Sequence, residues 1–355
     1  MQGRDIRRQV NVSCQGPLTR NNNALELAEH FIPRGGVLFT HLQGYDYLLS
    51  ERDGTGTHSS VGRSRIFLLP FLKAFGATNQ RIEEYSTVHI LLMPGAKIFL
   101  DTIEQGMDCF VVSAAYEAFL MSFCHLVHFH KENAYCTPLN LDSYVINESE
   151  RETLKDLADE ITHLSPLSYK NGSGSLSEET QAGHHHGHDR LAMILGEEIP
   201  AMQIGELVSQ HVVLAGHEKI KAVMDSLEKT GNHPEEVMYI GHSILDVAAL
   251  NWIKTRGGLA VSCNGDQTAR MAAEIAVTTG NSAILAILSE VFLQRGKEGV
   301  LEFVKDWDMK QVHTDRFLPY QSIINQFFSQ EPESFPHLEI VTSHLTGNPL
   351  EKTAL

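Results

Sequence analysis

The sequence predicts an α/β protein built on a doubly wound, mostly parallel β-sheet with a helical cap insertion. Three short runs are apolar almost without interruption, the pattern of strands buried on both faces: Cys109–Ser113, Met238–Gly241 and Ala260–Ser262. Segments with helical periodicity separate these runs, and this alternation is typical of α/β folds. The 355 residues are 42% hydrophobic and 20% charged, which fits a globular protein of roughly two domains.

The N-terminal part begins with a predicted strand, Val10–Val12, which ends in the turn Gln15-Gly16-Pro17. Apolar residues at helical spacing predict a helix over Ala24–Phe31. Gly, Thr and Ser predominate in Asp53–Gly62, which we predict to be a loop. A second helix is predicted over Arg65–Phe75, ending at Gly76.

Further along the chain, Pro94-Gly95 precedes a predicted helix over Ala96–Gln105. The strand Cys109–Ser113 follows, and then a helix from about Tyr116. Lys219 lies at the start of another predicted helix, 22 residues before Gly241. Because ligands of parallel sheets bind at the carboxyl ends of the strands, the residues that follow each strand are the candidates for function.

The predicted domain organisation follows from these elements. A core is expected from residues 8–21, 88–149 and 205–300, with a helical cap over 22–87. Residues 150–204 are expected to form a second insertion, and 301–355 a C-terminal helical extension.

Charge and cysteine content limit the expected partners and compartment. The net charge is −16, which disfavours nucleic acid and anionic membrane surfaces as partners. No apolar run is long enough for a membrane-spanning helix, and the polar N-terminus does not resemble a signal peptide. The five cysteines are scattered, which favours reduced thiols. We therefore expect a cytoplasmic protein.

A polar segment from Asn171 to His188 is rich in Gly, Ser, Glu and His. It contains His184-His185-His186-Gly187-His188, a sequence that can capture a transition metal. The favoured interpretation is a solvated surface loop that binds metal adventitiously, because such a loop lacks the surrounding groups that fix ligand geometry.

Polar residues at the strand ends stand in a recognisable order. Ser13-Cys14-Gln15-Gly16-Pro17 follows the first strand, Ser113 ends the second, and Lys219 opens a helix. Gly241-His242-Ser243-Ile244-Leu245-Asp246 follows a later strand. This order resembles the haloacid dehalogenase-like (HAD) superfamily of phosphohydrolases, which have a Rossmann-like core. The resemblance covers roughly residues 10–290.

The likeness is closest to an archaeal HAD branch described as energy-converting hydrogenase A subunit R-like. Stretches similar to that branch are Asn23-Ala24-Leu25-Glu26-Leu27-Ala28, Pro94-Gly95-Ala96 and Asp246-Val247-Ala248-Ala249-Leu250. The resemblance implies catalytic positions at Ser13, Gln15, Ser113 and Lys219. It also implies a Mg²⁺ site held by carboxylates of the first and fourth motifs.

The chain departs from the pattern of the superfamily at three acidic positions. Ser13 stands at the nucleophile position, Gln15 at the acid/base position, and His242 at the first acidic position of the fourth motif. Asp246 alone remains of the four carboxylates. One carboxylate is a poor cage for Mg²⁺, an amide cannot shuttle a proton, and serine is a weak nucleophile without a base. We therefore expect no cofactor.

Three interpretations of His242 and Asp246 remain open at this point. They could form a Ser13–His242–Asp246 relay, they could begin a site for a softer metal, or they could have drifted after catalysis was lost. The last interpretation is favoured.

The sequence predicts a HAD-like hydrolase scaffold that has lost Mg²⁺-dependent phosphatase chemistry and acts as a binding or regulatory protein. Its expected partner is a small anionic or phosphate-bearing ligand, or another protein. The alternatives are an active phosphohydrolase with an atypical site and a structural subunit of a larger complex.

Overall fold

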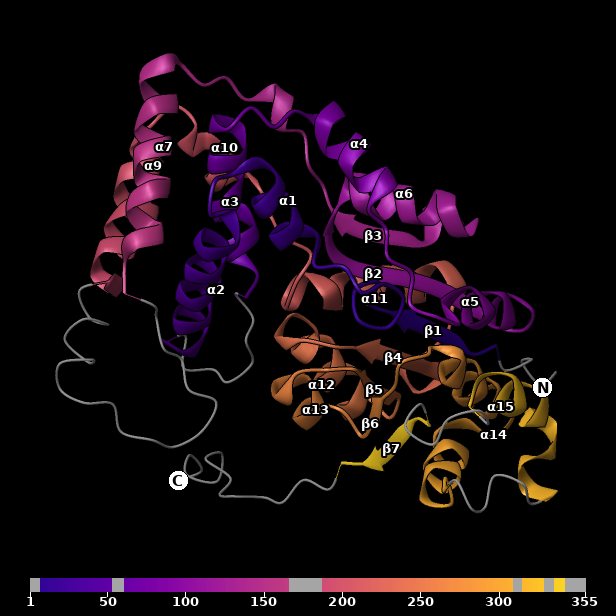
Figure 1. The fold of residues 1–355 in the computed structure, drawn as a ribbon. Coiled ribbons are helices and arrows are strands. Elements are labelled where there is room, and N and C mark those ends of the chain that lie inside the picture. The colour runs from indigo at the N-terminus through magenta and orange to yellow at the C-terminus, as the bar shows by residue number, and fades with distance from the viewer. Residues whose placement is uncertain (1–6, 53–60, 166–186, 309–314, 329–334, 342–355) are drawn as a thin grey trace, which may run out of the picture.

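The computed structural model describes residues 7–52, 61–165, 187–308, 315–328 and 335–341. Most of the Asp53–Gly62 loop and His184, His185 and His186 lie outside these residues. Figure 1 shows a sheet covered by helices on both faces, with a group of helices beside one end of it.

Seven strands form the sheet in the order β3-β2-β1-β4-β5-β6-β7. They are β1 (Gln9–Val12), β2 (Asp108–Tyr116), β3 (Ala134–Thr137), β4 (Val237–Gly241), β5 (Leu259–Cys263), β6 (Ile275–Thr278) and β7 (His337–Ile340). The first six are parallel, and β7 is antiparallel to β6. This topology confirms the predicted doubly wound, mostly parallel sheet. The strand order reverses on either side of β1, which makes the end of β1 the expected ligand-binding position.

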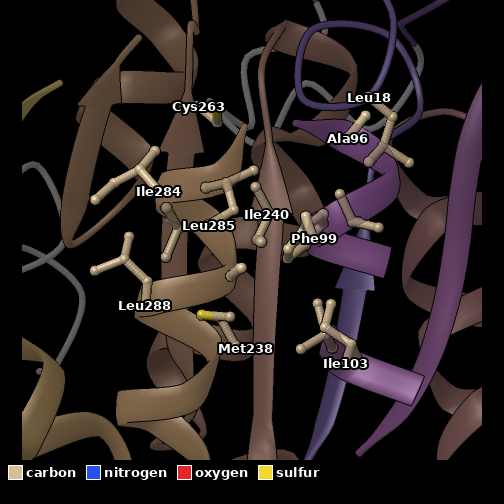
Figure 2. Close-up of a cluster of buried hydrophobic side chains, with 14 of the residues drawn as sticks. Leu18, Ala96, Phe99, Ile103, Met238, Ile240, Cys263, Ile284, Leu285 and Leu288 are labelled. Atoms are coloured by element: carbon tan, nitrogen blue, oxygen red, sulfur yellow. The ribbon is translucent and has the colours of Figure 1, made fainter. Parts of the chain in front are cut away.

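Successive side chains of each strand point to opposite faces of the sheet. On one face, Met238 and Ile240 of β4 pack with α5 (Ala96–Glu104), α6 (Glu117–Val127) and α14 (Ala283–Lys305). Figure 2 shows part of this cluster, with Phe99 of α5 and Leu285 of α14 directed at the same region. On the other face, Val237 and Tyr239 pack with α11 (His217–Thr230), α12 (Val247–Thr255) and α13 (Gln267–Ala272).

A second apolar cluster belongs to the helices beside the sheet. These are α1 (Asn23–Phe31), α2 (Gly35–Arg52), α3 (Arg63–Ala74), α4 (Asn79–Val88), α7 (Glu148–His163), α9 (Ile199–Ala201) and α10 (Gly205–Gln210). Helices of segment 22–87 and helices of segment 150–204 share this cluster. The two segments that the sequence separates therefore pack as one helical unit.

The C-terminal segment differs from the helical extension expected over 301–355. It contains the end of α14, the helix α15 (Gln321–Phe327) and also β7, which joins the sheet. The four residues His337–Ile340 mix polar and apolar side chains, and only Leu338 is buried. So short an edge strand gives no continuous apolar run to detect. Among the described helices, none combines the length and apolar character that crossing a membrane requires.

Candidate functional site

A cavity of about 360 Å³, lined mostly by polar residues, lies at the carboxyl ends of β1 and β4. Its walls come from the loop after β1, from α2, from the start of α3, from the loop after β4 and from the start of α13. Gln15, Asp46, Arg65, His242 and Thr268 represent these five segments. The cavity thus lies between the sheet and the helical unit, where the strand order reverses.

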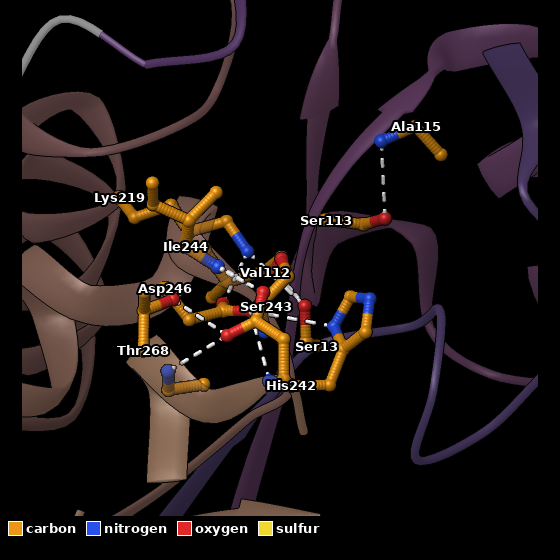
Figure 3. Close-up of polar contacts among 12 residues, drawn as sticks. Ser13, Val112, Ser113, Ala115, Lys219, His242, Ser243, Ile244, Asp246 and Thr268 are labelled. Atoms are coloured by element: carbon orange, nitrogen blue, oxygen red, sulfur yellow. Dashed lines mark hydrogen bonds and ion pairs between the residues drawn. The ribbon is translucent and has the colours of Figure 1, made fainter. Parts of the chain in front are cut away.

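Below this cavity, Asp246 is the centre of a fully buried polar cluster, shown in Figure 3. Its Oδ1 accepts hydrogen bonds from Lys219 Nζ at 2.5 Å and from the Tyr239 hydroxyl at 2.8 Å. Its Oδ2 accepts the backbone N–H groups of His242 at 3.0 Å and Ser243 at 3.2 Å. A carboxylate has about four acceptor positions, so the chain itself fills all of them.

The charge state of this cluster follows from its surroundings. Burial alone would raise the pKa of the Asp246 carboxyl, but the Lys219 ammonium and the hydrogen bonds outweigh burial and lower it. Burial also lowers the pKa of Lys219, and Asp246 opposes that effect. The pair is therefore a buried ammonium facing a carboxylate, with 1% and 0% of the two side chains exposed.

Two close backbone approaches hold these groups in place. A Cβ atom on Gly241 would lie 2.6 Å from Asp246 Cβ, so the loop after β4 folds tightly back on its own strand. The N–H of Gly216, just before α11, donates to the carbonyl of Leu245 at 3.0 Å. This bond fixes the first turn of α11, and with it Lys219, against the same loop.

The Ser13 hydroxyl accepts a hydrogen bond from Lys219 Nζ at 3.1 Å. It donates weakly to the carbonyl of Val112, at 3.5 Å. Both of these hydrogen bonds are buried, and Ser13 is only 2% exposed. A Ser13–His242 hydrogen bond, which a relay requires, is not among the contacts of the described residues.

The imidazole of His242 packs on the first loop. A Cβ atom on Gly16 would lie 2.6 Å from the His242 ring, and Gly16 has a φ of +89°, a conformation that suits glycine. His242 Nδ1 lies 3.4 Å from Asp246 Oδ2 but makes no hydrogen bond. The ring therefore occupies the space between the loops after β1 and β4.

The two remaining predicted positions lie apart from this cluster. Gln15 is 5% exposed and lines the cavity, and its Nε2 has no hydrogen-bond partner. Ser113 is buried within β2, where its Oγ accepts the Ala115 N–H at 3.2 Å and does not line the cavity (Figure 3). The structure thus brings Ser13, Lys219 and Asp246 together and directs Ser113 elsewhere.

Sequence reasoning missed three residues of the site: Tyr239, Arg65 and Asp46. Tyr239 interrupts an otherwise apolar strand, and Arg65 begins a predicted helix that is largely apolar. A hydroxyl or a guanidinium within an apolar segment indicates a buried polar contact, because polar groups in buried segments need partners. Asp46 gave no such signal. Within the described residues, no group of three His, Cys, Asp or Glu side chains is placed to hold a metal ion.

No protein-family model and no curated protein matches this sequence. Among solved structures, the protein is similar to gene product AF1437 from Archaeoglobus fulgidus, with a TM-score of 0.69 and 21% identity over 86% of this chain and 88% of that one. Apo phosphoserine phosphatase gives a TM-score of 0.43 at 11% identity, covering 80% and 98% of the two chains. A substrate-bound phosphoserine phosphatase gives 0.40 at 13% identity, covering 77% and 93%.

The fold can be assigned from the topology and the site together. The parallel sheet reverses its order at β1. Ser13 follows β1, Lys219 opens α11, and Asp246 follows β4, and the three side chains meet at one point. With the likeness to the archaeal structure, these features show that the chain has a mostly parallel α/β fold that it shares with that protein.

Proposed function

We propose that this HAD-fold protein is a binding or regulatory protein that does not carry out Mg²⁺-dependent phosphoryl transfer. The observation that carries the proposal is the state of Asp246, the one carboxylate left of the four in the motif pattern. Its acceptor positions are filled by Lys219, Tyr239 and two backbone N–H groups. It is fully buried.

The donor set does not fit the Mg²⁺ ion that the fold family implies. Mg²⁺ takes octahedral oxygen ligands and is usually bound through one or two carboxylates. Here an ammonium already lies 2.5 Å from Asp246 Oδ1, so a cation would have to displace it. Ser13, Gln15 and His242 offer no further carboxylate at the motif positions.

The nucleophile position also lacks an activating base. Serine attacks only when a neighbouring group can accept its proton. The nearest candidate, Lys219, is held as an ammonium by Asp246 and donates to the Ser13 oxygen. His242 packs on the loop after β1 but makes no hydrogen bond to Ser13 among the contacts of the described residues. The amide of Gln15 cannot exchange a proton in catalysis.

A binding role is supported by the cavity above the ion pair. Its volume of about 360 Å³ suits a small molecule. Arg65 places a guanidinium in its wall, and Gln15 adds an amide donor without a partner. Because Lys219 is neutralised by Asp246, Arg65 is the group that would hold an anionic or phosphate-bearing ligand.

This proposal predicts that inorganic phosphate binds without a metal ion. In isothermal titration we expect phosphate to bind in the presence of a chelator, with an unchanged affinity in millimolar Mg²⁺. Arg65→Met should weaken that binding, while Arg256→Met, which removes an exposed arginine stacked on Trp252, should leave it unchanged. Phosphate binding that requires Mg²⁺ would contradict the proposal and favour an atypical phosphohydrolase. Absence of binding, with a protein partner that co-purifies in fixed ratio, would favour a structural subunit.

A further inference from the structure

The cavity at the ends of β1 and β4 collects buried polar atoms that lack hydrogen-bond partners. Buried polar groups in folded proteins are nearly always paired, so a concentration of unpaired ones needs an explanation. Apart from His242 and Ser243, which contact Asp246, four such atoms belong to described side chains that line this cavity. They are Gln15 Nε2, Asn22 Oδ1, Asp46 Oδ1 and Arg65 Nε. A bound molecule with complementary groups would satisfy them.

Arg65 is the cationic member of this set. It lies in the first turn of α3, is 6% exposed, and its Nε donor has no partner. Its backbone carbonyl accepts the Tyr116 hydroxyl at 2.6 Å, which ties this turn to the end of β2. The position of Arg65 is therefore fixed by the fold while a donor of its guanidinium remains unused. An anionic group is the natural acceptor for it.

Asp46 is the anionic member, and only half of its carboxylate is used. Its Oδ2 accepts the N–H of Gly62 at 3.0 Å, and the N–H and hydroxyl of Ser64 at 3.1 and 3.0 Å. Its Oδ1 is buried in the same cavity wall without a partner. The Asp46 carboxylate is thus locked at the start of α3 with one oxygen left to accept hydrogen bonds.

The unpaired atoms fall into two complementary kinds. Arg65 Nε and Gln15 Nε2 can only donate, whereas Asn22 Oδ1 and, when the carboxyl is ionised, Asp46 Oδ1 can only accept. A simple anion would satisfy the donors and leave the buried Oδ1 atom of Asp46 without a partner. Such an uncompensated buried acceptor is costly. An ammonium group has three donors and no acceptor, so it matches the second kind.

We propose that this cavity binds a small zwitterion, with its anionic group at Arg65 and Gln15 and its ammonium group at Asp46 and Asn22. The inference rests on the proposed binding function and specifies the class of ligand. Because α2 and α3 are joined by the Asp46–Ser64 hydrogen bonds, both charged residues belong to one preformed wall. One small molecule can then reach both.

A charge-matched set of probes tests this proposal by isothermal titration. The set is β-alanine and γ-aminobutyrate as zwitterions, succinate as a dianion and putrescine as a dication. We expect at least one zwitterion to bind more tightly than succinate and putrescine. In Asp46→Asn, the preference for that zwitterion over succinate should fall by about tenfold, the size expected for a charged hydrogen bond. Arg65→Met should weaken the binding of both the zwitterion and succinate.

The controls separate this proposal from the proposed function. Asp46→Asn keeps an oxygen for the N–H groups of Gly62 and Ser64, and thermal denaturation checks that it folds. Asp101→Asn, which removes an exposed carboxylate on α5, should not alter the preference. If phosphate binds without metal but no zwitterion is preferred, the zwitterion proposal is wrong and anion binding stands. If a zwitterion is preferred but Asp46→Asn leaves that preference unchanged, the proposed site of the ammonium group at Asp46 is wrong. If neither phosphate nor any probe binds, both proposals are wrong.

Discussion

Replacing Asp246 by asparagine is expected to lower the free energy of unfolding by about 3–5 kcal/mol, the usual effect of removing one partner of a buried ion pair. The substitution leaves the Lys219 ammonium buried with 1% of its side chain exposed and no charged partner. The asparagine NH₂ would also face the N–H and O–H donors that now converge on the carboxylate. Urea denaturation at neutral pH measures this loss.

Two further variants define the control for this prediction. Lys97 and Asp101 also form a Lys–Asp ion pair, but on the exposed side of α5. Asp101→Asn should therefore lower the free energy of unfolding by no more than about 0.5 kcal/mol. The double variant Lys219→Met, Asp246→Leu removes both charges and should recover part of the stability. A loss in Asp246→Asn no larger than that in Asp101→Asn would show that the buried pair is not the stabilising centre described here.

The same carboxylate predicts a dependence of stability on pH. The pKa of Asp246 is lower in the folded protein than in the unfolded chain, where it is about 3.9. Its stabilising contribution is therefore present above the unfolded value and is lost as the pH falls toward the folded value. The difference in unfolding free energy between the wild type and Asp246→Asn should stay constant near neutral pH and shrink below about pH 4.

Phe99→Ala is expected to cost about 3–5 kcal/mol, because it deletes a large, fully buried side chain from the core. Phe99 is 0% exposed and belongs to the cluster in which α5 and α14 cover one face of the sheet (Figure 2). Urea denaturation measures the loss. Lys97→Ala on the exposed side of the same helix should change stability by less than about 0.5 kcal/mol. An equal effect of the two substitutions would contradict the packing described here.

The sheet could be predicted from the sequence where strands are buried on both faces. The runs around Cys109, Met238 and Ala260 are apolar because helices cover both sides of β2, β4 and β5. The short strands β3 and β7 lie at the edges and are partly exposed, so their composition does not differ from that of a loop. The packing of helices from segments 22–87 and 150–204 into one unit depends on contacts between distant residues, so no local sequence pattern predicts it.

The site could be predicted where side chains follow parallel strands directly. Ser13 and Asp246 were expected at one edge because the carboxyl ends of neighbouring parallel strands meet there. Ser113 was expected to end its strand, but β2 continues to Tyr116. Its hydroxyl therefore lies within the strand and bonds to the Ala115 N–H. The pairing of Lys219 with Asp246 depends on how α11 docks, which spacing alone does not fix.

The release of phosphate from generic phosphate esters in Mg²⁺ tests the central proposal most directly. We predict that the wild type gives the same rate as buffer with Mg²⁺, and the same rate as Lys219→Ala. This prediction follows from our proposal that the ion pair between Lys219 and Asp246 leaves neither a metal site nor an activated Ser13. Robust Mg²⁺-dependent hydrolysis that is lost in Lys219→Ala would show that this site is an active phosphohydrolase and would contradict the proposal.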